Sequence, residues 1–203
     1  MSQAAFDVSR ETQTRLDRFL ALFAQWSARM NLVSASTRND VVERHVADSL
    51  QLYRLVGTRQ WLDLGSGAGF PGLIVAIALA ERNEGWVDLV ESNRKKAAFL
   101  RVAVLETGAR ASVHDVRAEA MIDRVPDCDA VSSRALAPLD QLLGLAEPWL
   151  CKGTRTKGWF HKGRDHRSEV SKARGSWQFD LVEHPSRIDR DSVILQIANL
   201  KRL

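Results

Sequence analysis

The residues from 62 to 72, LDLGSGAGFPG, have the composition of a loop that binds a small molecule. Residues 67–72 fit the pattern GxGxxG, in which glycines let backbone amides approach a ligand closely. The loop follows a predicted strand and precedes a predicted helix, as this pattern requires. Glu91 lies 19 residues beyond Gly72, at the end of the next predicted strand, where a carboxylate can accept hydrogen bonds from ribose hydroxyls. The spacing predicts a site for a cofactor that contains a nucleoside.

The glycines alone fit both a dinucleotide and S-adenosylmethionine, and Asp63 helps to separate the two. A carboxylate at the loop entrance would repel a pyrophosphate, but it would attract the sulfonium and ammonium groups of S-adenosylmethionine. Asp63 could also hold the loop amides in place, or hydrogen-bond only to neighbouring backbone. On charge, we expect S-adenosylmethionine to bind at Asp63, Gly67 and Gly69, and an NAD-dependent oxidoreductase is the alternative.

If the chain transfers a methyl group, the absence of certain motifs narrows the class of atom that accepts it. Enzymes that methylate exocyclic amines carry an Asn/Asp/Ser-Pro-Pro-aromatic motif after the fourth strand, where this chain has VSSRAL at 131–136. Neither Cys128 nor Cys151 stands in the context of a nucleophilic cysteine. A ring nitrogen such as guanine N7 has a free lone pair, so it needs positioning and charge stabilisation but no general base. The sequence favours such an acceptor, and no residue is assigned as a general base.

No metal site is expected from the histidines, cysteines and acids of this chain. His45 and Asp48 stand three residues apart, on one face of a predicted helix. A metal would need more ligands than these two, and no other histidine or cysteine cluster joins them. We therefore expect a packed, hydrogen-bonded pair that closes this helix onto the cofactor site.

Basic residues favour a nucleic-acid partner. The net charge is +4, and eight Lys and Arg stand against two acids between residues 151 and 175. Aromatic residues and histidines interrupt this run, which favours RNA or DNA contact over a merely solvated face, and Arg164 belongs to it. Arg94, Lys95 and Lys96 begin a predicted helix and either touch phosphate or form a solvated face. A non-catalytic RNA-binding protein is the second alternative.

Hydrophobic periodicity predicts one α/β domain of 203 residues with a helical segment before it. Apolar runs predict strands, and spacings of three and four predict helices between them, so the units are βαβ and the sheet is parallel. The last two strands, joined by PSRIDRD, should form an antiparallel hairpin, and 164–174 is expected to be a polar connection. The strands are expected at 60–64, 86–91, 111–114, 129–133, 156–161, 176–184 and 192–200, and the helices at 71–81, 94–107 and 138–150.

The first 56 residues are expected to form a helical cap (1–56) on a main domain (57–203). An apolar stripe predicts the first helix, 31–40 is polar, and a second helix follows. No signal peptide and no apolar run long enough to span a bilayer is found, so we expect a cytoplasmic monomer without a membrane partner. The stripe consists of Leu16, Phe19, Leu20, Phe23, Trp26 and Met30.

Several motifs in order resemble the ribosomal RNA small subunit methyltransferase G family of bacteria. The resemblance implies a class I S-adenosylmethionine-dependent methyltransferase: a Rossmann-like, seven-stranded, doubly wound sheet with an N-terminal helical extension. It also implies methylation of guanine N7 at one position of small-subunit (16S) rRNA, either as free rRNA or in the small ribosomal subunit. The motifs are Asn31 with Leu32, RHVADS at 44–49, DLGSGAGFPG at 63–72, KKAAFL at 95–100, RAE at 117–119, SRA at 133–135 and KG at 162–163.

The same resemblance implies roles for single residues. Gly65 and Phe70 would line the cofactor pocket. Ala118 and Glu119 would lie beside the adenine, and Arg134 would reach the methionine end. Each of these roles comes from the family and not from the spacing.

Lys162 is the first candidate for holding RNA near the site, since the family has a Lys-Gly pair at this strand end. Two positions depart from the family pattern. Val33 stands where threonine is frequent, and Leu136 where an aromatic residue is common. Each departure alters local packing and leaves the expected activity in place.

Overall fold

The computed structural model describes residues 6–28, 40–57, 60–151 and 155–203. Some sequence expectations lie outside these residues. They are the position of Met30 in the first helix, the motif formed by Asn31 and Leu32, the departure at Val33 and nearly all of the polar segment 31–40.

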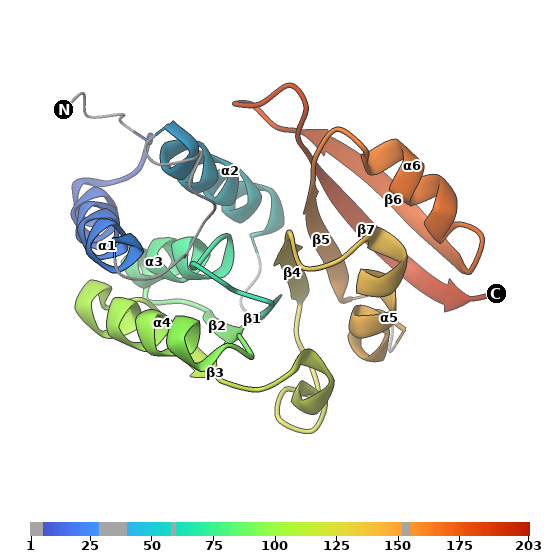
Figure 1. Cartoon of the computed structure of the whole chain (residues 1–203), viewed down its shortest axis with the longest axis horizontal. Helices are drawn as coiled ribbons and strands as arrows, with labels where there is room; N and C mark the ends of the chain where they lie inside the picture. Colours follow the sequence, from blue (N-terminus) through green and yellow to red (C-terminus); the bar gives the residue numbers. More distant parts are fainter. Residues whose placement is uncertain (1–5, 29–39, 58–59, 152–154) are drawn as a thin grey trace.

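A seven-stranded mixed sheet forms the centre of the molecule, with the order β3-β2-β1-β4-β5-β7-β6 (Figure 1). The first five strands are parallel, and β7 runs antiparallel to both β5 and β6. The predicted hairpin is thus confirmed, with its second strand inserted between β5 and β6. The strands are β1 Gln60–Leu64, β2 Trp86–Val90, β3 Ala111–His114, β4 Ala130–Arg134, β5 Lys157–Lys162, β6 Trp177–Pro185 and β7 Val193–Arg202.

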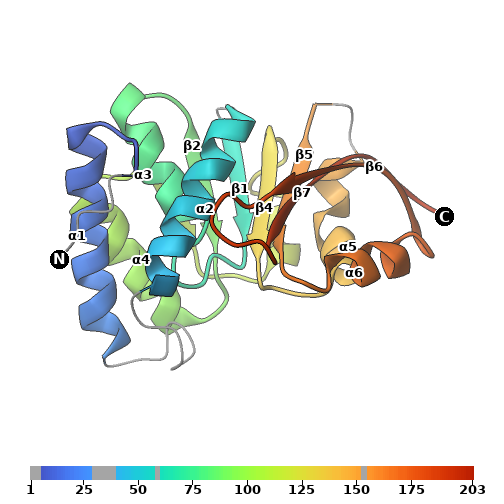
Figure 2. The same cartoon turned by 90° about the horizontal axis from the view of Figure 1, so that it is seen from above.

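Helices cover both faces of the sheet, so the predicted doubly wound architecture is confirmed (Figure 2). Along β1, Trp61 packs in the apolar cluster of α1–α4, and Leu62 packs in the cluster of α5 and α6. Such alternation follows from the two-residue period of a strand. The helices are α1 Arg10–Ser27, α2 Asp40–Val56, α3 Gly72–Arg82, α4 Arg94–Thr107, α5 Leu139–Leu150 and α6 His166–Ala173.

Helix α6 corrects the expectation that residues 164–174 form a polar connection. The helix buries only Val170 and Ala173 and is otherwise polar. Two apolar positions in eight residues are too few to produce a visible helical period, so the sequence pattern concealed this helix.

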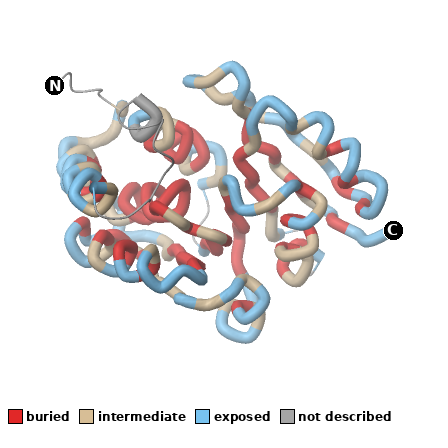
Figure 3. The backbone as a smooth tube through the Cα atoms, viewed as in Figure 1, coloured by how far each residue is buried: buried red, intermediate tan, exposed pale blue. Residues whose placement is uncertain are grey.

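The first two helices pack into the same core as α3 and α4. Phe19 of α1 contacts the rings of Phe70 and Phe99, with centroids 5.6 and 6.3 Å away. Helix α3 is buried from Gly72 to Leu79, because α1, α2 and α4 and the sheet surround it (Figure 3). The division into a cap of residues 1–56 and a domain of 57–203 stays a prediction, since one apolar cluster joins the two parts.

The carboxyl ends of β1, β2 and β4 meet at one edge of the sheet. The segments that follow them, which begin at Gly65, Glu91 and Ala135, therefore come together there. No helix in the described part of the chain is long and apolar enough to cross a membrane.

Candidate functional site

Most of the predicted cofactor residues line one cavity of about 660 Å³, called here the main cavity. It lies at the carboxyl ends of β1, β2 and β4, and its volume is typical of a small-molecule site. Asp63 and Gly69 do not line it. The predicted residues that it brings together are Gly65, Gly67, Phe70, Glu91, Ala118, Glu119 and Arg134.

The glycine loop is held in a backbone conformation that favours glycine. Gly65, Gly67 and Gly69 have φ angles of 69°, 54° and 98°, in the left-handed region. The amide of Ser66 donates a hydrogen bond to the carbonyl oxygen of Val90 (2.9 Å), which ties the loop to the end of β2. The loop therefore presents its backbone to the main cavity in a fixed shape.

Glu91 fixes the same loop through its carboxylate. Its Oε2 accepts a hydrogen bond from the amide of Gly67 (2.9 Å), and its Oε1 accepts one from the amide of Asn93 (2.7 Å). A carboxylate has about four acceptor positions, so capacity is left for hydroxyl groups of a ligand. Asn93 in turn accepts from the amides of Lys95 and Lys96 and so caps α4. Glu91 thus connects the loop, the cavity and the start of α4.

Asp63 is fully buried beneath the loop. Its Oδ1 accepts a hydrogen bond from the hydroxyl of Ser132 on β4 (2.7 Å), and its Oδ2 packs so closely on Gly72 that a Cβ there would lie 2.5 Å away. Burial raises the pKa of Asp63 to about 6, an effect that the hydrogen bond from Ser132 opposes. The geometry favours support of the loop and of α3 over direct contact with a ligand. Gly69 likewise faces Leu73, not the cavity.

At the other end of the cavity, Arg134 contacts a buried carboxylate. Its Nη1 lies 3.4 Å from Oδ2 of Asp48, whose Oδ1 accepts a hydrogen bond from the hydroxyl of Ser186 (2.6 Å). The expected hydrogen-bonded pair of His45 and Asp48 is therefore wrong, since Asp48 turns to Arg134 and Ser186. His45 lines the main cavity, and its ring centroid lies 5.3 Å from that of Phe70.

Several cavity residues carry a weak signal in the sequence or none. The sequence predicts only a packing role for His45, as the first member of the pair that it forms with Asp48. Arg117 lines the cavity and directly precedes the predicted Ala118. Leu145 comes from α5, on the face of the sheet opposite to α1–α4, and no local sequence pattern places it in the main cavity.

The predicted RNA-binding residues are dispersed. Lys96 lines the main cavity, whereas Arg94 and Lys95 are exposed at the start of α4 outside its lining. Arg164 is exposed and pairs with Asp191, with Nη2 and Oδ2 2.8 Å apart. These positions leave Arg94, Lys95 and Arg164 accessible to a large partner.

Lys162 is engaged inside the protein. Its Nζ donates hydrogen bonds to the carbonyl oxygen of Ala137 (2.8 Å) and to Oε2 of Glu169 (2.7 Å), and its side chain is 7% exposed. The same Oε2 accepts from the amide of Leu139 (2.7 Å), at the start of α5. Lys162 is thus placed to fix the segment between β4 and α5 and does not project toward solvent as a phosphate contact would.

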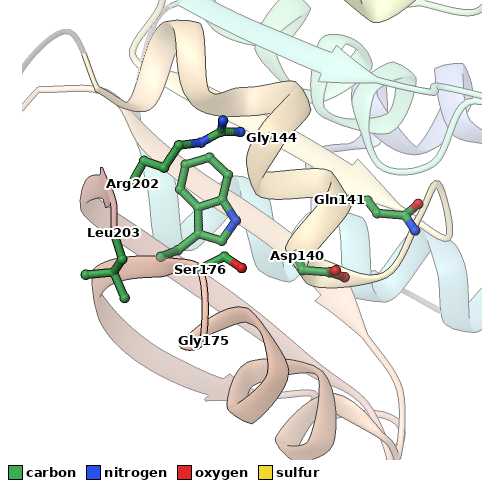
Figure 4. A pocket seen from close by; sticks show the side chains of 8 residues that line it. Asp140, Gln141, Gly144, Gly175, Ser176, Arg202 and Leu203 are labelled. Carbon is green, nitrogen blue, oxygen red and sulfur yellow. The ribbon is translucent and has the colours of Figure 1, made fainter.

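A second depression, of about 500 Å³, lies between α5 and the ends of β6 and β7 (Figure 4). The guanidinium of Arg202 lies 4.9 Å above the ring of Trp177 there. None of the predicted site residues lines this depression, so the main cavity is the candidate site. In the described part of the chain, no group of three or more His, Cys, Asp and Glu could hold a metal ion.

Comparison with known proteins agrees with these features. A family model described as rRNA small subunit methyltransferase G matches residues 12–190. The chain is 57% identical over 197 residues to ribosomal RNA small subunit methyltransferase G of Rhizobium meliloti (strain 1021), covering 96% of this chain and 92% of that protein. It is 55% identical over 200 residues to the protein of the same name in Sinorhizobium fredii (strain NBRC 101917 / NGR234), covering 98% and 94%.

Solved structures with low sequence identity share the fold. An O-methyltransferase from Bacillus cereus in complex with SAH has a TM-score of 0.61 at 14% identity, covering 89% of this chain and 90% of that one. Precorrin-6y C5,15-methyltransferase from Geobacter metallireducens GS-15 has a TM-score of 0.54 at 15% identity, covering 79% and 88%. The class I methyltransferase fold expected from the sequence is therefore confirmed.

Proposed function

The chain belongs to the rRNA small subunit methyltransferase G family, and from this membership we propose that it transfers the methyl group of S-adenosylmethionine to N7 of a guanine in 16S rRNA. The observation that carries the proposal is the main cavity, in which Glu91 and Arg134 flank a loop of glycine backbone. Family membership does not favour the NAD-dependent alternative. The cavity has the volume of a small-molecule site, which favours an enzyme over a protein that only binds RNA.

We propose that the donor lies across the strand ends, with its adenine at Ala118 and Glu119 and its methionine at Arg134. Ala118 and Glu119 follow β3, Arg134 ends β4, and three strand spacings separate these two strands in the sheet. At the usual spacing this is about 14 Å, enough for an extended nucleoside with an amino-acid tail. The ribose would lie between them, at Glu91.

The residues of the chain bind and orient, and none is needed as a base. When bound, S-adenosylmethionine supplies an electrophilic methyl group that a ring nitrogen attacks with its own lone pair. Glu91 holds the loop and the ribose in place, and the contact of Arg134 with Asp48 keeps a guanidinium at the opposite end. This arrangement supplies proximity and a fixed electrostatic environment, which suffice for such a transfer.

The proposed substrate is 16S rRNA, free or in the small ribosomal subunit. Accessible basic residues support this partner: Arg94 and Lys95 at the start of α4, and Arg164 between β5 and α6. The proposal includes a cytoplasmic location, where rRNA is made and assembled in bacteria, and action as a monomer.

The test is methylation of small-subunit particles from a strain that lacks this enzyme. With methyl-labelled S-adenosylmethionine, the label should enter 16S rRNA, and mapping should find it at N7 of one guanine. Particles from the parent strain, already modified, are the matched control and should take up little label. A parallel reaction with deproteinised rRNA identifies the preferred substrate. No label in the unmodified particles, or tighter binding of NADH than of S-adenosylmethionine in calorimetry, would contradict the proposal.

A further inference from the structure

The main cavity contains one imidazole to which the proposed donor arrangement gives no role. His45 comes from α2 and lies at the cavity end shared with Arg134, since Asp48, one turn further along α2, contacts that guanidinium. The adenine end lies after β3, on the far side of β2 and β1 in the sheet. His45 is therefore remote from the proposed adenine end and lies at the end where a methyl group would be transferred.

The last hairpin of the chain fixes this part of α2. The hydroxyl of Ser186 donates to Asp48 (2.6 Å), and the side-chain Nε2 of Gln51 donates to the carbonyl oxygen of Pro185 (2.8 Å). The side-chain oxygen of Gln51 accepts from the amide of Arg187 (3.0 Å). Three hydrogen bonds thus hold the helix, and with it the imidazole, before any substrate arrives.

The imidazole is held without charge by its surroundings. Burial, Arg134 and Arg44 lower the pKa of His45 to about 4. Burial also lowers the pKa of His161, whose Nε2 lies 3.5 Å from the backbone oxygen of Asp48, to about 3. Asp48, the nearby carboxylate, is engaged with Arg134. Nδ1 of His45 is buried and has no hydrogen-bond partner among the described residues.

A ring without charge suits an acceptor base that becomes charged. Methylation at N7 gives the guanine ring a positive charge, which a protonated histidine would repel. An aromatic face attracts a cation instead. Phe70 also lines the main cavity and packs against His45, with the two rings 5.3 Å apart and tilted by 56°. The two rings together form an aromatic wall at the transfer end of the cavity.

We propose that His45, together with Phe70, forms one wall of the binding site for the acceptor guanine and contacts that base as a neutral ring. The inference rests on the proposed function and extends it to the base. His45 acts in base binding and specificity, and it is not a general base. The ligand of this subsite is a purine that carries positive charge after the reaction.

The experiment compares His45→Phe, His45→Ala and His45→Lys with the parent protein on unmodified small-subunit particles. His45→Phe keeps the ring and should retain kcat/KM within about threefold. His45→Ala should lose about ten- to a hundredfold in kcat/KM through a higher KM for particles and a lower kcat, and His45→Lys should lose more because of its charge. Calorimetry should find donor affinity unchanged within about twofold in His45→Phe and His45→Ala. His184→Ala, on β6 and outside the lining of the main cavity, is the matched control and should behave like the parent.

Separate outcomes test the inference and the function beneath it. If the parent protein labels no guanine N7, the proposed function fails. If the parent labels it and His45→Ala has unchanged kinetics, the inference fails and the function stands. Loss of donor affinity equal to the loss of activity would assign His45 to the donor site and overturn the inference. So would an acid limb near pH 6.5 in the parent that His45→Phe lacks, because it would show a titrating base. Thermal unfolding of each variant identifies any that fails to fold, and His45→Phe then carries the test.

Discussion

At the scale of single residues, Glu91 combines structural and binding chemistry in one carboxylate. It accepts hydrogen bonds from two backbone amides, at Gly67 and Asn93, and it lines the main cavity. Removal of the carboxylate would leave both amides without this partner and would free the loop. The donor should therefore lose both a ribose acceptor and the fixed shape of its binding loop.

Glu91→Ala should weaken the binding of S-adenosylmethionine by about 1–3 kcal/mol, the cost of leaving paired groups unsatisfied. Isothermal titration calorimetry measures this directly. Glu84→Ala, at an exposed position before β2, is the control and should bind the donor normally. Equal affinities for Glu91→Ala and the parent would remove Glu91 from the donor site.

At the scale of elements, the connection from β4 to α5 is braced from β5 and α6. Lys162 bonds to the carbonyl oxygen of Ala137, and Glu169 joins Lys162 to the amide of Leu139. Arg134 immediately precedes this connection and lines the cavity. The brace thus fixes the cavity wall on the side of β4.

Lys162→Met should lower the free energy of unfolding by about 2–4 kcal/mol, because the carbonyl oxygen of Ala137 loses its ammonium partner and the carboxylate of Glu169 keeps only the amide of Leu139. Urea denaturation measures the loss. The control is Lys172→Met, whose ammonium is 3.5 Å from Asp140 on a side chain that is 71% exposed. An exposed pair of this kind contributes at most about 1 kcal/mol, so equal losses in the two variants would refute the brace.

The same variant tests the earlier RNA hypothesis for Lys162. With its ammonium bonded inside the protein, Lys162→Met should leave the slope of log affinity for rRNA against log salt unchanged. A slope reduced by about one would restore Lys162 as a phosphate contact.

At the scale of the whole molecule, Asp63 makes stability depend on pH. Its pKa is raised from 3.8 to about 6 in the folded protein, so the unfolded chain ionises first as pH rises. The stabilisation from the protonated carboxyl is fully present below about pH 3.8 and is lost as pH rises through about 6. A shift of this size corresponds to a loss of about 3 kcal/mol.

Asp63→Asn carries no charge and should remove this dependence. Relative to the parent, its free energy of unfolding should therefore rise by up to about 3 kcal/mol between pH 4 and pH 7.5. Urea denaturation at several pH values gives the comparison. Asp115→Asn, at an exposed position paired with Arg101, is the control and should differ from the parent by at most about 1 kcal/mol. A constant difference for Asp63→Asn would contradict the raised pKa.

Much of the fold could be predicted from the sequence, because strands and long helices carry clear apolar periods. The edge of the sheet that holds the site could also be predicted, since the loop at Gly65 and the acid at Glu91 come after neighbouring parallel strands. Helix α6 has no clear hydrophobic period, so the sequence does not show that Glu169 contacts Lys162. Lys162 was therefore predicted to bind RNA. Asp63 was assigned to a ligand by the sign of its charge, whereas its burial depends on packing with Ser132 and α3 that no local pattern shows.

The contact of α2 with the last hairpin also orders events during synthesis. Asp48 and Ser186 are separated by 138 positions, and Gln51 reaches its two partners across 134 and 136. Translation delivers the N-terminal partner first, and the hairpin follows it by 134 to 138 residues. The transfer end of the cavity is consequently finished only after the hairpin has been made. A nascent chain can assemble the glycine loop on β1 and β2 well before it can present a finished surface to RNA.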